Sequence, residues 1–171
     1  MNHMTRVMVA AAALAALAAP AGAQVADKKT LTLDGAKSIA AAAAAEAKRL
    51  NVGGAVAIVD DGGSLVYLER LDGTFPAAAP VAIEKARTAA QFRRPTRVFE
   101  DAIKNGRLAL LGVQVMTPLQ GGVPIVIDGQ VIGAIGVSGA ANAQQDDDIA
   151  AAASTALSPM SSSGAGAGAK R

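Results

Sequence analysis

The first clear pattern along the chain is that of an amphipathic helix over residues 31–50. Apolar residues recur there at helical spacing and form one stripe, made of Leu33, Ala36, Ile39, Ala40, Ala43 and Ala44. Thr32 or Asp34 is suited to cap the amino end of this helix, and Asn51 and Gly53 are suited to end it.

Residues 54–71 predict a β-hairpin. The segments GAVAIVD (54–60) and SLVYLERL (64–71) are rich in apolar and β-branched residues. Asp61-Gly62-Gly63 lies between them and supplies the positive φ angles that a tight turn needs.

A second hairpin is predicted over residues 123–137. Asp128-Gly129 separates two apolar segments, residues 123–127 and 131–137, and is a type I′ turn signal. Gly133 and Gly136 lie within the second strand, where a missing side chain lets another backbone or a ligand come close.

Three further helices complete the pattern. Pro80 fits the first turn of a helix over residues 80–92, which Pro95 stops. A short helix follows, with Thr96 as its cap and Gly106 at its end. Residues 107–116 lack a clear period and are irregular or a short strand, and a last helix covers 144–157. The order of elements predicts an α+β domain in which helices cover an antiparallel sheet.

The first 23 residues have the layout of a secretory signal peptide. A short segment with one positive charge (1–6) precedes an unbroken apolar run (7–19), and Ala21-Gly22-Ala23 ends the segment before Gln24. The run is shorter than the ~20 apolar residues of a membrane-spanning helix, although a buried N-terminal helix is an alternative. We therefore expect a periplasmic or secreted protein whose mature chain has no membrane span.

The mature chain then divides into three parts. Residues 24–30 are an N-terminal linker, residues 31–157 form one domain, and residues 158–171, rich in Ser, Gly and Ala, are expected to be a disordered tail.

Composition narrows the function classes. Loss of Arg6 with the leader takes the formal net charge from +2 to +1, which does not suggest nucleic acid as a partner. The chain has no cysteine, and His3 in the leader is its only histidine, so the mature chain lacks Ser-His-Asp catalysis, Cys-His catalysis and zinc ligands. Aromatic residues make up 2% of the chain, so its core must be built from small aliphatic side chains that favour close approach of helices to the sheet.

Four segments together resemble the GlcG/HbpS-like family, which also occurs as the C-terminal domain of PduO-type proteins. They are AIVDDGGSLVYLERLDG (57–73), EKARTAAQFRRP (84–95), GGVPIVIDGQVIGAIGVSG (121–139) and QQDDDIA (144–150). The resemblance implies a profilin-like or PAS-like antiparallel sheet of about five strands flanked by helices. It also implies homo-oligomers, binding of haem or a related tetrapyrrole, and, in secreted relatives, haem or redox sensing beside a two-component sensor.

The resemblance also implies site residues. Lys85, Thr88 and Phe92 match ligand-facing positions of a family helix. The loop Gly121-Gly122-Val123-Pro124 matches the segment that shapes the same crevice, which places Gly122 and Pro124 at its rim.

Histidine ligation of haem iron is excluded in the mature chain, because His3 lies in the leader. Tyr67, the only tyrosine, is then the best metal ligand, since tyrosine is an accepted axial ligand of ferric haem. Lys85 is the candidate partner of a propionate.

Each of these residues also has a structural interpretation. Lys85 also suits a surface ion pair with a glutamate or a strut between helix and sheet. Thr88 also suits a bond with its own helix turn, and Tyr67 suits packing. Asp146, Asp147 and Asp148 are read as charges at a helix start, because successive helix residues point about 100° apart and do not converge on one cation.

Two other functions remain open at this point. One is a small organic-acid-binding protein or enzyme that uses Lys85 as an electrostatic clamp. The other is an oligomeric structural partner with an empty crevice.

We predict that the mature protein begins at or near Gln24, because cleavage follows the small residues 21–23. N-terminal sequencing of protein from a native periplasmic or culture fraction measures this. Recovery of intact Met1 from that fraction would contradict it.

Overall fold

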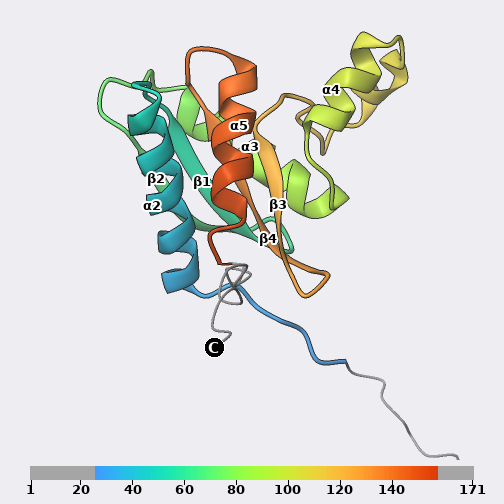
Figure 1. The fold of residues 1–171 in the computed structure, drawn as a ribbon. Coiled ribbons are helices and arrows are strands. Elements are labelled where there is room, and N and C mark those ends of the chain that lie inside the picture. Colours follow the sequence, from blue (N-terminus) through green and yellow to red (C-terminus); the bar gives the residue numbers. More distant parts are fainter. Residues whose placement is uncertain (1–25, 158–171) are drawn as a thin grey trace, which may run out of the picture.

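The computed structural model describes residues 26–157, and they form a three-layer arrangement. Helices α2 (Leu33–Arg49) and α5 (Ala143–Ser154) cover one face of a sheet, and α3 (Ala78–Phe92) covers the other, as Figure 1 shows. The predicted leader and the predicted tail lie outside the described residues.

The sheet has four strands in the order β2-β1-β4-β3. They are β1 (Ala55–Asp60), β2 (Leu65–Arg70), β3 (Gly122–Ile127) and β4 (Gln130–Ser138). All neighbouring strands are antiparallel. The predicted α+β class is therefore confirmed, with four strands in residues 26–157 in place of about five.

The two hairpin turns differ. Asp128 and Gly129 have φ angles of 48° and 76°, as a type I′ turn requires. In the other turn only Gly63 has a positive φ angle, 91°, and the Asp60 carboxylate accepts bonds from the amides of Gly62 and Ser64. The acidic side chain thus supplies part of the turn geometry that we expected from backbone conformation alone.

Alternate residues of β1 belong to two separate hydrophobic cores. Val56 and Ile58 point toward α2 and α5 and join the larger cluster of Ile, Val and Ala side chains. Ala55, Ala57 and Val59 point toward α3. Because side chains alternate across a strand, these five residues contribute to the packing on both faces of the sheet.

The core beneath α3 consists almost wholly of alanine. Ala82, Ala86 and Ala89 of the helix are fully buried against the sheet. A Cβ atom built on Gly136 would overlap the carbonyl oxygen of Ala82, and one on Gly122 would overlap that of Lys85. The helix backbone therefore lies directly on the strands, as the small side chains of the sequence predict.

An arm stands away from the three layers (Figure 1). It consists of α4 (Arg97–Lys104), a 3-10 helix, η1 (Leu108–Gly112), and the chain up to residue 119. Thr96 precedes α4 as predicted, but its side chain does not cap the helix. The segment 107–116, expected to be irregular or a strand, contains η1.

The helices of residues 26–157 include none that is both long and apolar enough to cross a membrane. The alanines of α2 differ in their exposure to solvent. Ala40 and Ala43 are buried in the core, whereas Ala41 and Ala45 are exposed.

We predict that Gly136→Ala lowers the free energy of unfolding by about 1–3 kcal/mol, because the added methyl group forces α3 off the sheet. Chemical denaturation measures the change. Gly112→Ala is the matched control, since a Cβ there meets nothing within 4 Å. Equal stability of the two variants would contradict close packing at Gly136.

Candidate functional site

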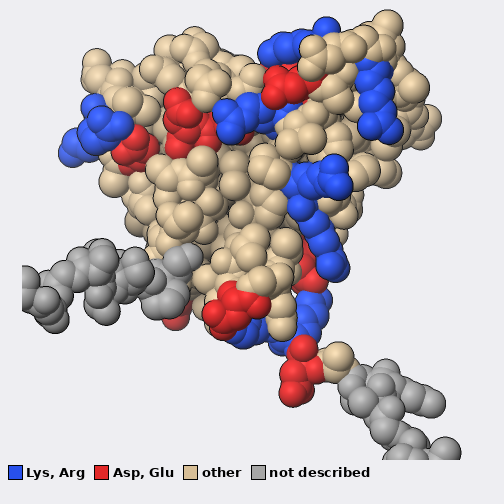
Figure 2. Space-filling model, turned by 45° about the vertical axis from the view of Figure 1, so that its right-hand side comes forward, with Lys and Arg blue, Asp and Glu red and all other residues tan. Residues whose placement is uncertain are grey.

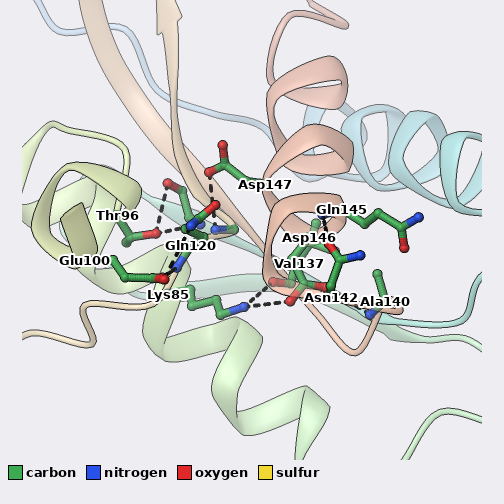
Figure 3. A network of polar contacts seen from close by, with 12 residues as sticks. Lys85, Thr96, Glu100, Gln120, Val137, Ala140, Asn142, Gln145, Asp146 and Asp147 are labelled. Carbon is green, nitrogen blue, oxygen red and sulfur yellow. Dashed lines mark hydrogen bonds and ion pairs between the residues drawn. The ribbon is translucent and has the colours of Figure 1, made fainter. Parts of the chain in front are cut away.

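A buried ion pair joins α3 to α5. Lys85 is only 3% exposed, and its Nζ donates to Asp146 Oδ2 at 2.9 Å and to the carbonyl oxygen of Val137 at 3.0 Å (Figure 3). The second oxygen of Asp146 accepts from the amide of Ala140 at 2.9 Å. The charge of Lys85 is therefore neutralised by a carboxylate that is itself held in place.

The next residue of α5 ties the arm to the domain. Asp147 is 2% exposed, and its Oδ2 lies 3.2 Å from Nη1 of Arg97 in α4. Its Oδ1 accepts from the amide of Gly121 at 3.3 Å. Burial raises the pKa of Asp147, and the charge of Arg97 and the Gly121 amide only partly offset this rise.

Two further contacts fix the arm on the loop before β3 (Figure 3). Thr96 exchanges hydrogen bonds with Gly122, its amide donating to the Gly122 carbonyl and its hydroxyl accepting from the Gly122 amide, each at 2.9 Å. Glu100 accepts from the backbone amide of Gln120 at 2.7 Å. Burial acts to raise the pKa of Glu100, but hydrogen bonds from Lys104 and Gln120 outweigh it and leave that pKa lowered.

A cleft of about 400 Å³ opens where the arm meets the end of α3. Its lining is mostly apolar and combines residues of α3, α4, η1 and the segments that join them: Phe92, Arg94, Val98, Phe99, Ala102, Arg107 and Leu110. The rings of Phe92 and Phe99 meet edge to face with centroids 5.2 Å apart. Such a surface suits a flat apolar ligand that carries negative charge at its edge.

Two other hollows have a different character. A larger groove of about 690 Å³ lies beside the end of α2 and is lined by a mixture of aliphatic, small and polar residues. A third, of about 270 Å³, is lined by Lys28, Asp61, Arg93, Gly129, Gln130 and Val131. Since neither has an aromatic wall, the cleft at Phe92 is the better candidate for a planar ligand.

Comparison with known proteins decides the family. A family model described as "Haem degrading protein HbpS-like" matches residues 31–155. The chain belongs to the HbpS-like family. Protein GlcG of Escherichia coli (strain K12) is 47% identical over 111 residues, which cover 65% of this chain and 83% of that protein.

Solved structures of HbpS-like proteins have the same fold. A double mutant of HbpS from Streptomyces reticuli is 29% identical, with a TM-score of 0.72 over 80% of this chain and 92% of that chain. The crystal structure of a PduOC–haem complex is 28% identical, with a TM-score of 0.69 over 76% of this chain and 96% of that chain. Both the family description and this complex associate the HbpS-like fold with haem.

The HbpS-like resemblance placed Lys85 opposite a propionate, whereas in the structure Lys85 has partners within the chain. The ammonium group is buried and bonded to Asp146 and Val137, so it is not presented to a ligand. Lys85 is the strut between helix and sheet that we weighed as the alternative. The clamp function for organic acids loses its cation for the same reason.

Thr88 and Gly122 also have structural partners. The Thr88 hydroxyl donates to the carbonyl oxygen of Glu84 at 2.8 Å and accepts from the amide of Thr117 at 2.9 Å. Gly122 is buried against the backbone of Lys85, so it does not form an open rim. These two positions hold α3 and its neighbours together.

Tyr67 lies on the other face of the sheet. It pairs with Ile58, packs toward α2 and α5, and its hydroxyl donates to Glu69 at 3.3 Å. Pro124 pairs with Ala134 on the α3 face and is half-buried. One subunit therefore does not bring Tyr67 into a crevice with Lys85 or Thr88, and of the predicted site residues only Phe92 lines the cleft.

The acidic residues 146–148 have a larger structural role than the sequence predicted. Asp146 and Asp147 do more than start α5, because each pairs with a cation of another element, whereas Asp148 is exposed and accepts from Gln144. Arg94 and Arg107, which line the cleft, were also missed. The only sequence signal for the cleft was the position of Arg94, two residues after Phe92 in the segment QFRRP.

We predict that Lys85→Met lowers the free energy of unfolding by about 3–5 kcal/mol, because it leaves the Asp146 carboxylate buried without its cation. Lys37→Met, at an exposed position of α2, is the control and should change stability by less than about 0.5 kcal/mol. Denaturant titration compares them. A Lys85→Met protein as stable as the control would show that the ion pair is dispensable.

Proposed function

We propose that this chain is an exported binding protein for haem or a related tetrapyrrole. The observation that carries the proposal is the cleft at Phe92, whose aromatic and aliphatic walls match the face of a macrocycle. Membership of the HbpS-like family and the haem complex of PduOC support it.

The net positive charge of the arm favours binding of an anionic ligand. Residues 93–119 contain five basic and two acidic residues. Figure 2 shows several clusters of Lys and Arg among uncharged residues on the right-hand side of the view. The propionates of haem carry negative charge, so the field of the arm favours their approach to the cleft. The haem-binding proposal therefore agrees with both the shape and the charge of the site.

Export and assembly belong to the same proposal. The layout of residues 1–23 supports export. Exposed large apolar side chains on the arm support self-association into a homo-oligomer: Val98, Leu108, Leu111, Val115 and Leu119. An exported haem-binding oligomer would suit haem or redox sensing beside a two-component sensor.

We predict that haemin binds saturably to the purified protein and that Phe99→Ala weakens binding by about 1–3 kcal/mol, because it removes half of the aromatic wall. Absorption titration measures the affinity. Phe75→Ala is the control, since Phe75 is 54% exposed and lies outside the cleft.

A Phe99→Leu variant tests whether a loss of haemin affinity comes from a disturbed arm or from the missing ring. It removes the ring but keeps a large apolar side chain in α4. Haemin binding no tighter than to an unrelated protein would reject the proposed function. Normal binding by Phe99→Ala would move the site away from this cleft.

A further inference from the structure

The lining of the cleft at Phe92 contains no good ligand for iron. Five of its seven residues are apolar and two are arginines. Arginine stays protonated in proteins and has no lone pair to give to a metal. A tetrapyrrole in this cleft therefore meets surfaces for its ring and its carboxylates, but nothing for its metal.

The potential iron ligands of the described chain lie elsewhere. Tyr67 is bonded to Glu69 on the α2 and α5 face of the sheet, whereas the cleft begins at the end of α3 on the opposite face. Lys85 is engaged by Asp146. Met116 is buried and does not line the cleft.

The two arginines of the cleft come from the ends of two helices. Arg94 directly follows the left-handed cap of α3, and its amide donates to the carbonyl oxygen of Ala89. Arg107 follows α4, and its amide donates to the carbonyl oxygen of Ala102. In the part of the chain from 26 to 157 neither guanidinium forms an ion pair, unlike Arg97 and Lys104 of the same arm.

Because of their positions, the two arginines determine whether the cleft attracts an anion. The carboxyl end of a helix carries partial negative charge and repels a carboxylate. Arg94 and Arg107 stand at two such ends, so their side chains must supply the attraction, and guanidinium binds carboxylate through paired hydrogen bonds.

We infer that this cleft recognises a planar tetrapyrrole through its apolar face and its carboxylates, independently of the metal, with Arg94 and Arg107 as the carboxylate-binding residues. The inference rests on the proposed function and specifies its ligand class. Metal-free porphyrin dicarboxylates are then ligands equivalent to haem, and the bound iron has no axial ligand from this subunit.

The test compares three probes on the full-length mature protein: haemin, metal-free protoporphyrin and the dimethyl ester of that porphyrin. Dissociation constants come from fluorescence quenching and absorption titration. Haemin and the free porphyrin should bind within about threefold of each other, and the ester should bind roughly tenfold or more weakly because it has no charged carboxylate.

Variants assign the effect to residues. Arg94→Gln and Arg107→Gln should each weaken the two dicarboxylates about tenfold while leaving the ester unchanged. Arg70→Gln, at an exposed arginine of β2 outside the cleft, is the control and should bind all three probes normally. Tyr67→Phe should leave the absorption spectrum of bound haemin unaltered.

The outcomes separate this inference from the proposed function. If no probe binds above the level of an unrelated protein, the proposed function itself fails. If haemin binds but the free porphyrin does not, or Tyr67→Phe changes the spectrum, metal recognition is real and the inference is overturned. Unchanged affinities in both arginine variants would overturn it as well.

Discussion

The close approach of α3 to the sheet is the constraint on which the rest of this structure depends. The strands opposite the helix carry Gly122, Ala134 and Gly136, and the helix presents alanines, so backbone meets backbone. Packing at this density leaves no crevice under α3. The cleft next to α3 instead forms where that helix ends, between Phe92 and the arm.

The same constraint explains the buried charges. A lysine on a helix that lies directly on a sheet must find partners beside the strands, and Lys85 finds the carbonyl oxygen of Val137 and the carboxylate of Asp146. Removing two charges from water costs about as much as their attraction returns, but loss of one partner is costly. The pair therefore fixes how α3 and α5 are placed more than it adds to net stability.

Much of the fold was predictable because its signals are local. Helix periodicity, the Asp128-Gly129 turn and alternating strand residues each lie within a few positions of one another. The partners of Lys85 were not predictable, since Asp146 is 61 positions away and the residue types alone do not select it. The partner of Thr96 was not predictable for the same reason. A threonine before a helix is a good cap, yet the Thr96 hydroxyl accepts a hydrogen bond from the amide of Gly122, which is distant in the sequence. Family resemblance identified the segment that contains Phe92, but the side-chain neighbours of that segment come from the arm.

Adjacent carboxylates on one turn of α5 have unequal surroundings. Asp146 faces a lysine that is sealed from solvent, whereas Asp147 faces Arg97, whose side chain is 46% exposed. Dissolved ions screen the second pair far more than the first. High ionic strength should thus weaken the Asp147–Arg97 contact between the arm and the body while it leaves the Lys85–Asp146 pair intact, so the arm would then depend on its uncharged contacts, such as the bonds between Thr96 and Gly122.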